Sequence, residues 1–172
     1  MAAWDRHLER WIVHHRWSSL NDVFVWLTKI GTHGLVWLAL ALIVAVLRRS
    51  VWPFVLVAIA VLASDALAGL LKAAVGENRP NEPDPLVAIP HSHSFPSGHT
   101  ATAAAGATVL SFLVPRAAPL FVLLAAAIAY SRLYVGVHFP LDVVGGAVIG
   151  VATALLLLAA VRRRSTRWLR SG

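Results

Sequence analysis

Two apolar stretches, each long enough to cross a lipid bilayer as a helix, constrain the fold of this chain most. Val51–Leu71 and Leu141–Val161 each run for roughly 20 residues, the length of helix that spans a hydrocarbon core. Asp65 and Asp142 are their only charged residues. The whole chain of 172 residues is 58% hydrophobic, above the share usual in soluble domains. The sequence therefore predicts an all-α integral membrane helix bundle, with residues 1–172 forming a single domain.

Shorter apolar segments complete the predicted bundle. Residues 98–114 and 117–130 carry no Asp, Glu, Lys or Arg and are separated by a break at Pro115–Arg116. Residues 34–47 are too few to cross the bilayer alone, so we expect this segment to extend back through residues 23–30 and form one span with them. Backbone groups in lipid have no water to bond, which favours helices throughout. We therefore expect about five transmembrane helices.

The first residues predict a helix that lies on the membrane rather than across it. Within residues 3–17, apolar side chains recur at helical spacing, and charged ones fill the other side. The apolar positions are Trp4, Leu8, Trp11 and Ile12. This pattern is typical of an amphipathic helix in the headgroup region. An amphipathic helix packed on the protein remains an open alternative.

Arginines in the connections predict the orientation of the bundle. Arg48–Arg49, Arg116 and the tail from Arg162 to Arg170 fall on one side if five spans alternate. Positively charged loops favour the cytoplasm. The loop of residues 72–95 and the turn of residues 131–139 then lie together on the outer side. We expect a multi-pass protein of the bacterial inner membrane with these polar stretches facing outside.

Three cations in the polar stretches indicate an anion-binding site. Lys72 and Arg79 belong to the first stretch, residues 72–80, and Arg132 belongs to the third, residues 131–142. Arginine suits paired contacts with phosphate oxygens, and lysine adds a compact charge. Each alone would be an ordinary interfacial side chain. Together on one membrane face they favour a common anionic ligand.

The second stretch, Pro96-Ser97-Gly98-His99, predicts the start of a helix. Ser97 is a candidate N-cap. The N–H groups that follow it, beginning with Gly98, would lack helical partners and are suited to bind phosphate. A plain capped helix is the alternative.

Two histidines and a carboxylate supply candidate reactive groups. His138 and Asp142 are four residues apart, and Pro140 between them fits a first helical turn. A carboxylate on one ring nitrogen leaves the other free to attack phosphorus, although such a pair also serves to cap helices. His99 is a candidate general acid for the leaving oxygen. His91 is interpreted as a solvated loop residue, as is His93.

Other kinds of site receive little support. The chain has no cysteine, and no group of side chains near the histidines suits a metal, so we expect neither metal nor cofactor. The net charge of +7 is not gathered in one patch with aromatic residues, which argues against nucleic acid. Asp65 in mid-span is interpreted as a hydrogen-bonded packing residue rather than a proton relay.

The three stretches together resemble the signature of the type 2 phosphatidic acid phosphatase superfamily, the lipid phosphate phosphatases. That signature is Lys-x6-Arg-Pro, Pro-Ser-Gly-His and Ser-Arg-x5-His-x3-Asp, and this chain carries all three in order. The resemblance implies that His138 forms a phosphohistidine, Asp142 orients it and His99 protonates the leaving group. It implies phosphate binding by Lys72, Arg79, Ser97, Gly98 and Arg132. Many members of this family have six spans, whereas five are predicted here.

A small bacterial member of this family resembles the polyprenyl diphosphatases, so the favoured reaction converts a polyprenyl diphosphate to the monophosphate without a metal. Phosphatidylglycerol phosphate, phosphatidic acid and a decaprenyl-linked sugar phosphate remain alternative substrates. Vanadate-dependent haloperoxidases have a similar site, but they are larger and soluble. A protein that binds or flips phosphate lipids without hydrolysis is the alternative from another class. The expected partners are thus a lipid phosphate and the bilayer, with the oligomeric state left open.

Overall fold

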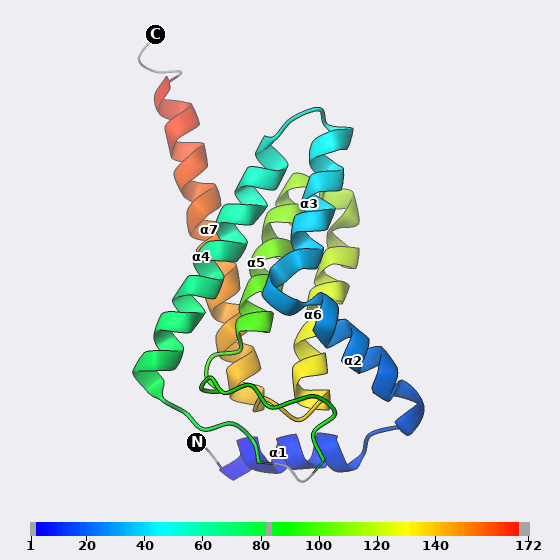
Figure 1. The fold of residues 1–172 in the computed structure, drawn as a ribbon. Coiled ribbons are helices and arrows are strands. Elements are labelled where there is room, and N and C mark those ends of the chain that lie inside the picture. The colour runs from blue at the N-terminus through cyan, green and yellow to red at the C-terminus, as the bar shows by residue number, and fades with distance from the viewer. Residues whose placement is uncertain (1–2, 82–83, 169–172) are drawn as a thin grey trace.

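The computed structural model describes residues 3–81 and 84–168, and all regular structure in those ranges is helical. Seven α-helices follow one another along the chain (Figure 1): α1 Ala3–His14, α2 Asn21–Ile30, α3 Leu35–Leu47, α4 Trp52–Val75, α5 Gly98–Leu113, α6 Ala118–Tyr134 and α7 Pro140–Trp168. Short 3-10 turns at Ser18–Leu20, Thr32–Gly34 and Pro115–Ala117 join some of them. The all-α membrane bundle predicted from the sequence is confirmed.

Helix α5 forms the centre of the bundle and packs against α4, α6 and α7. Its alanines are buried and let its neighbours approach closely, while Trp37 of α3 fills the space beside Gly106. A Cβ on Gly106 would come within 2.5 Å of the Trp37 ring. Gly146 and Gly150 of α7 face the α5 backbone in the same way. The small-residue contacts typical of membrane helices therefore hold α5 in place.

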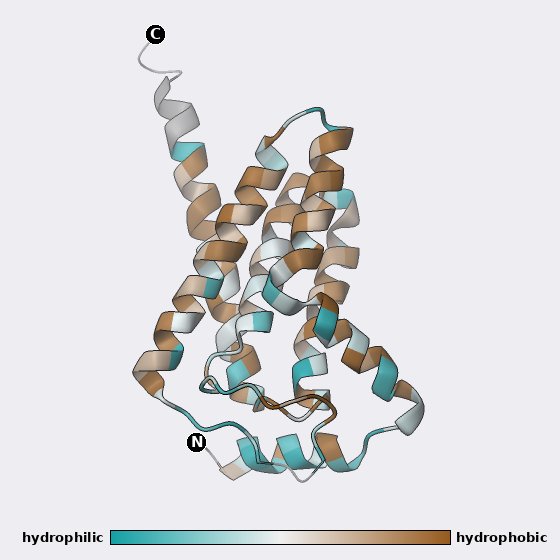
Figure 2. Cartoon of the chain, in the orientation of Figure 1, coloured by the Kyte–Doolittle hydropathy of each residue, from teal (hydrophilic) through white to brown (hydrophobic). Residues whose placement is uncertain are grey.

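Within the described residues, three helical segments are long and apolar enough to cross a membrane: Trp52–Val75, Pro115–Tyr134 and Pro140–Arg163. A fourth candidate is the pair Ser18–Ile30 and Thr32–Leu47, which is bent by 53°. The expectation of one continuous first span was wrong in this respect, because the chain turns sharply between α2 and α3. Helix α5 has 16 residues, shorter than those spans, and lies inside the bundle. Apolar residues predominate on the outward-facing ribbons of the bundle (Figure 2).

Helix α1 lies across one end of the bundle (Figure 1) and ends at His14, earlier than the predicted 17. It turns its acidic side inward, with Asp5 and Glu9 buried, and leaves Trp4 and Trp11 about half exposed. The backbone N–H of Leu141 donates to Asp5 Oδ1 at 2.9 Å. The acidic face of α1 therefore packs on protein, and its location in the headgroup region stays a prediction.

The arginine-bearing connections between α3 and α4 and between α5 and α6, together with the C-terminal part of α7, lie at the end opposite α1 (Figure 1). Arg170 of the tail lies outside the described residues. This arrangement agrees with the grouping expected from the sequence. The loop between α4 and α5 and the turn between α6 and α7 lie together at the α1 end.

Candidate active site

The loop after α4 is anchored by the first two predicted cations. The Lys72 ammonium, in the last turn of α4, donates to the carbonyl oxygens of His93 and Ser94 at 2.8 and 2.9 Å. The Arg79 guanidinium donates to the Ser92 carbonyl at 2.7 Å and the Val137 carbonyl at 2.8 Å. Both cations are therefore held by backbone oxygens of the polar loops.

Helix α5 begins at the second stretch, as predicted. Ser97 is the N-cap, and its hydroxyl oxygen accepts from the Thr100 backbone N–H at 3.5 Å and the Thr100 hydroxyl at 3.1 Å. The Ser97 N–H donates to the Asp142 carbonyl at 2.9 Å, which joins the starts of α5 and α7. Ser97 itself is fully buried. Its N-cap role leaves the half-buried Gly98 and His99 in the first turn of the helix, where backbone N–H groups lack helical partners and are suited to bind phosphate.

His138 and Asp142 form a buried pair at the start of α7. The His138 Nδ1 lies 3.0 Å from Asp142 Oδ2, and the same oxygen accepts from the Ser94 hydroxyl at 2.5 Å and the Phe139 N–H at 2.8 Å. On the other side of the ring, His138 Nε2 lies 3.0 Å from an Arg79 nitrogen. Since guanidinium only donates, Nε2 is an acceptor and the ring proton lies on Nδ1. The arrangement fixes the tautomer with the Nε2 lone pair toward the cations.

Burial governs the charge states of this region. Burial lowers the pKa of His138 to about 3, although its hydrogen bond to Asp142 acts in the opposite direction, so the ring is neutral. Burial also lowers the pKa of the Arg79 guanidinium from its usual value, and a guanidinium remains charged nonetheless. The pKa of Glu77 is raised, first by burial and then by the nearby Asp142 carboxylate.

Six of the eight predicted residues line one cavity of about 360 Å³: Lys72, Arg79, Gly98, His99, Arg132 and His138. Ser97 and Asp142 are not among the lining residues. The Asp142 side chain contacts His138, which lines the cavity, and the Asp142 backbone carbonyl accepts from the Ser97 N–H. Arg132 is buried and donates to the Thr28 hydroxyl, which ties α6 to α2. The cavity is at the lower end of the size range of small-molecule sites. It has room for a headgroup and not for a long lipid tail.

Ser94, Thr32 and His33 lie at or beside the cavity and were not singled out from the sequence. Ser94 contacts Asp142, and the Thr32 hydroxyl lies 3.4 Å from His99 Nε2. His33 lines the cavity, and so does Asp65, which was expected to be a packing residue. Thr32 and His33 lie in the bend between α2 and α3. The hydrophobic pattern of this segment did not predict the bend. The mid-span position of Asp65 was the one available signal.

The part of the chain that the structure describes contains no group of three or more His, Cys, Asp or Glu side chains arranged to hold a metal ion. His91 and His93 are exposed loop residues, in agreement with the interpretation from the sequence. The positive charge at the cavity comes from one lysine and two arginines. Their cationic groups are suited to bind a tetrahedral oxyanion.

Comparison with known proteins gives consistent matches. Residues 53–166 match the PAP2 superfamily. The chain is 29% identical to the undecaprenyl-diphosphatase of Sulfolobus acidocaldarius, over 81% of this chain and 69% of that protein. It is 34% identical to the decaprenylphosphoryl-5-phosphoribose phosphatase of Mycobacterium tuberculosis, over 76% of this chain and 75% of that protein.

A solved structure is similar over nearly the whole chain. The transmembrane PAP2-type phosphatidylglycerolphosphate phosphatase of Bacillus subtilis superposes with a TM-score of 0.81 at 26% identity. The match covers 94% of this chain and 86% of that one. The similarity therefore includes the helices outside the three motif stretches.

Proposed function

This chain belongs to the PAP2 superfamily and is a membrane-embedded phosphatase, and from that premise we propose that it removes the terminal phosphoryl group of a polyprenyl-linked lipid phosphate through a phosphohistidine at His138. The observation that carries this proposal is the His138 ring, which has Asp142 on Nδ1 and presents its acceptor nitrogen Nε2 to the Arg79 guanidinium. Relatives whose names include a polyprenyl diphosphate or a polyprenyl phosphoribose support the polyprenyl tail.

The first chemical step follows from this geometry. His138 Nε2 attacks phosphorus, and the bond from phosphorus to the leaving oxygen breaks. The leaving oxygen takes a proton from His99, which is favoured in its protonated form by the negative charge of a bound phosphate. Asp142 stabilises the positive charge that the substituted His138 ring acquires. Lys72, Arg79 and Arg132 hold the three other phosphoryl oxygens, aided by the first N–H groups of α5.

Water completes the cycle. A water molecule gives a proton to the now neutral His99 and attacks phosphorus, so that the bond from phosphorus to His138 Nε2 breaks. Inorganic phosphate leaves, and both histidines return to their starting forms. Because phosphoryl transfer depends mostly on positioning and charge, we propose that the three cationic side chains suffice without a metal ion. The site would face the outside of the inner membrane.

The proposal is tested with purified protein in detergent and farnesyl diphosphate as substrate, in the presence of EDTA. We expect phosphate release by the unaltered protein and a loss of at least about 10³-fold in His138→Ala, as for other removed nucleophiles. Quenched turnover with radiolabelled substrate should give an acid-labile, alkali-stable label on the protein. His91→Ala is the matched control, because His91 is an exposed histidine of the neighbouring loop.

Two results would contradict the proposal in different ways. Release of phosphate at an undiminished rate by His138→Ala would show that another group is the nucleophile. Binding of lipid phosphates without release of phosphate from any of them would favour the alternative of a binding or flipping protein.

A further inference from the structure

The candidate cavity continues beyond its cations along one face of α4. Asp65, Ala68, Gly69 and Lys72 all line it, and this spacing of three or four residues marks one side of a helix. Asp65 lies about 10 Å from Lys72 along the helix axis. Ala68 and Gly69 between them are small, and a Cβ on Gly69 would meet nothing within 4 Å. The cavity thus has a cationic end and an end that carries a carboxylate.

The two carboxyl oxygens of Asp65 face different groups. Oδ2 lies 3.8 Å from His33 Nδ1, and Oδ1 is the atom nearest to the position of a Cβ on Gly98, at 3.5 Å. Oδ1 therefore lies beside the backbone of Gly98, at the first turn of α5. The Asp65 side chain is 45% exposed, so this oxygen is accessible to a ligand in the cavity.

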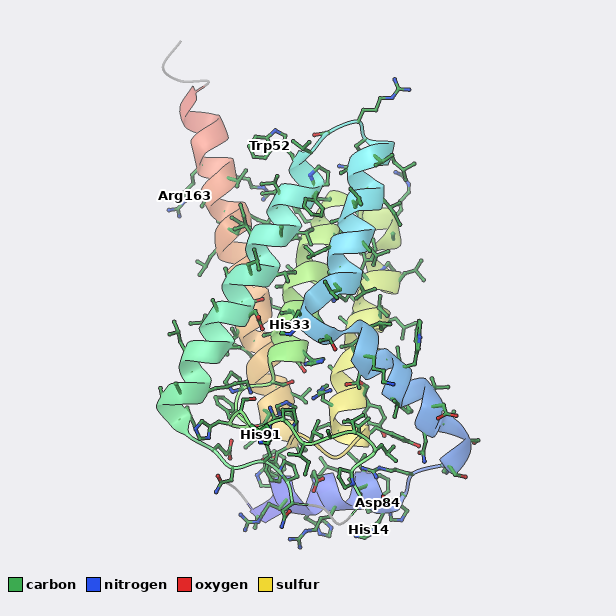
Figure 3. The ribbon with its side chains drawn as sticks, in the orientation of Figure 1. His14, His33, Trp52, Asp84, His91 and Arg163 are labelled. Atoms are coloured by element: carbon green, nitrogen blue, oxygen red, sulfur yellow. The ribbon has the colours of Figure 1, made fainter. Side chains whose placement is uncertain are left out.

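The bend between α2 and α3 carries His33 (Figure 3), whose Nδ1 lies 3.8 Å from this carboxylate. His33 has φ 49°, a left-handed conformation that residues with a side chain rarely adopt. Gly34 after it has φ 70° and packs so closely that a Cβ would lie 2.6 Å from Val61. The same bend brings the Thr32 hydroxyl to 3.4 Å from His99 Nε2. The bend therefore brings groups to both His99 and Asp65.

The negative charge of Asp65 restricts the kind of leaving group that the Asp65 end of the cavity can accept. The cations Lys72, Arg79 and Arg132 line the cavity in which the transferred phosphoryl group is proposed to bind. A second phosphate beyond it would meet the Asp65 carboxylate, and like charges at short range repel. A hydroxyl group at the same place would donate a charge-assisted hydrogen bond to that carboxylate.

We infer that Asp65, positioned by His33, forms a leaving-group subsite that selects phosphomonoesters of a hydroxyl-bearing alcohol, such as a sugar or polyol, over diphosphates. This inference rests on the proposed phosphatase function and specifies its substrate class. It replaces the preference for a polyprenyl diphosphate drawn from the sequence. Asp65 in this role contacts the substrate without taking part in bond breaking.

The test compares two substrates that share a farnesyl tail: farnesyl diphosphate and farnesylphosphoryl ribose 5-phosphate. Phosphate release gives kcat/KM for each substrate with the unaltered protein, Asp65→Asn and Asp22→Asn. Asp22 is an exposed aspartate of α2 outside the cavity lining, so Asp22→Asn makes the same chemical change elsewhere. We expect the unaltered protein and the control to prefer the ribose phosphate by at least about tenfold, the worth of one hydrogen bond to a charged group. Asp65→Asn should lower this ratio by about tenfold or more.

Each result is informative. A preference of the unaltered protein for the diphosphate overturns the inference, and this comparison requires no variant to fold. An unchanged ratio in an active Asp65→Asn protein overturns it as well. If the unaltered protein releases phosphate from neither lipid nor from p-nitrophenyl phosphate, the proposed function itself fails, which is a distinguishable outcome.

Discussion

At the scale of single residues, the candidate site depends on side chains that fix other side chains. Asp142 Oδ2 accepts three hydrogen bonds, from His138, Ser94 and the Phe139 backbone. The carboxylate is therefore held in one orientation, and it holds the His138 ring in turn. Arg79 completes the set on the opposite nitrogen. The reactivity proposed for His138 follows from these neighbours rather than from the imidazole alone.

Ser94 offers a direct test of this arrangement. Replacing Ser94 with Ala removes one of the donors to Asp142 and leaves the His138 contact in place. We expect kcat to fall about tenfold with little change in KM, because a hydrogen bond to a charged group contributes about 1.5–3 kcal/mol. Ser92→Ala, in the same loop, is the control, since its hydroxyl contacts Arg79 rather than Asp142. Equal changes in KM for both variants would point to a general loosening of the loop.

The lowered pKa of His138 also predicts how stability depends on pH. The folded ring, with a pKa of about 3, remains neutral at pH 5, whereas the unfolded ring has a pKa of about 6.5 and binds a proton. The unfolded state thus binds more protons, and stability is lost as pH falls from about 6.5 toward 3. Between pH 7 and pH 5 this amounts to on the order of 2 kcal/mol.

Thermal unfolding in detergent measures this effect. The unfolding midpoint of the unaltered protein should fall between pH 7 and pH 5, and the fall should be smaller in His138→Gln, which cannot titrate. A variant whose midpoint falls by the same amount would assign the pH dependence to groups other than His138.

At the scale of helices, part of the arrangement was predictable from local pattern. The long apolar runs, the Ser97 N-cap and the start of α7 at Pro140 are each set by residues close together in the chain. The 53° bend was not predictable in this way. It depends on Gly31 and Gly34, which fit against Ile128 and Val61 from distant helices.

The candidate site likewise has parts that were predictable from local sequence and parts that were not. Its three motif stretches were recognisable because each is contiguous in sequence. The roles of Ser94, Thr32 and Asp65 depend on which helices pack together. The hydrophobic pattern of a single helix does not predict its neighbours. The inward turn of the acidic side of α1 is a further case, since Asp5 finds its partner at Leu141 of α7.

Contact between α5 and α7 gives a prediction at this scale. A Cβ on Gly146 would lie 2.4 Å from the Ser97 carbonyl oxygen and 3.0 Å from the Thr100 Cβ, so Gly146→Ala must push the helices apart. We expect the free energy of unfolding to fall by about 1–3 kcal/mol, the usual cost of overpacking. Activity should fall too, because Ser97 begins the proposed phosphate-binding turn.

Gly69→Ala is the matched control for stability. Gly69 is also a helical glycine, but a Cβ there meets nothing within 4 Å. Alanine should then be neutral or stabilise the helix by about 0.5–1 kcal/mol. Equal destabilisation by the two substitutions would show that close approach of α7 to α5 is not the cause.

At the scale of the whole molecule, the two ends of the bundle differ from its middle. Apolar residues predominate on the helices, and polar residues gather at the end that carries α1 and the α4–α5 loop (Figure 2). The arginine-bearing connections lie at the opposite end (Figure 1). The positive-inside rule then predicts that the candidate site faces away from the cytoplasm. A phosphatase in this orientation would act on lipid phosphates of the outer leaflet.

Single cysteines test this orientation, because the chain has no cysteine of its own. His91 and Arg163 are both exposed and lie toward opposite ends of the bundle (Figure 3). His91 is in the loop between α4 and α5, and Arg163 is in the C-terminal part of α7. We expect a membrane-impermeant maleimide to label His91→Cys in intact spheroplasts and to label Arg163→Cys only after the membrane is opened. Phosphate release by both variants would show that they are folded. Labelling of Arg163→Cys alone in intact spheroplasts would reverse the orientation and place the site at the cytoplasmic leaflet, where a different pool of lipid phosphates would be its substrate.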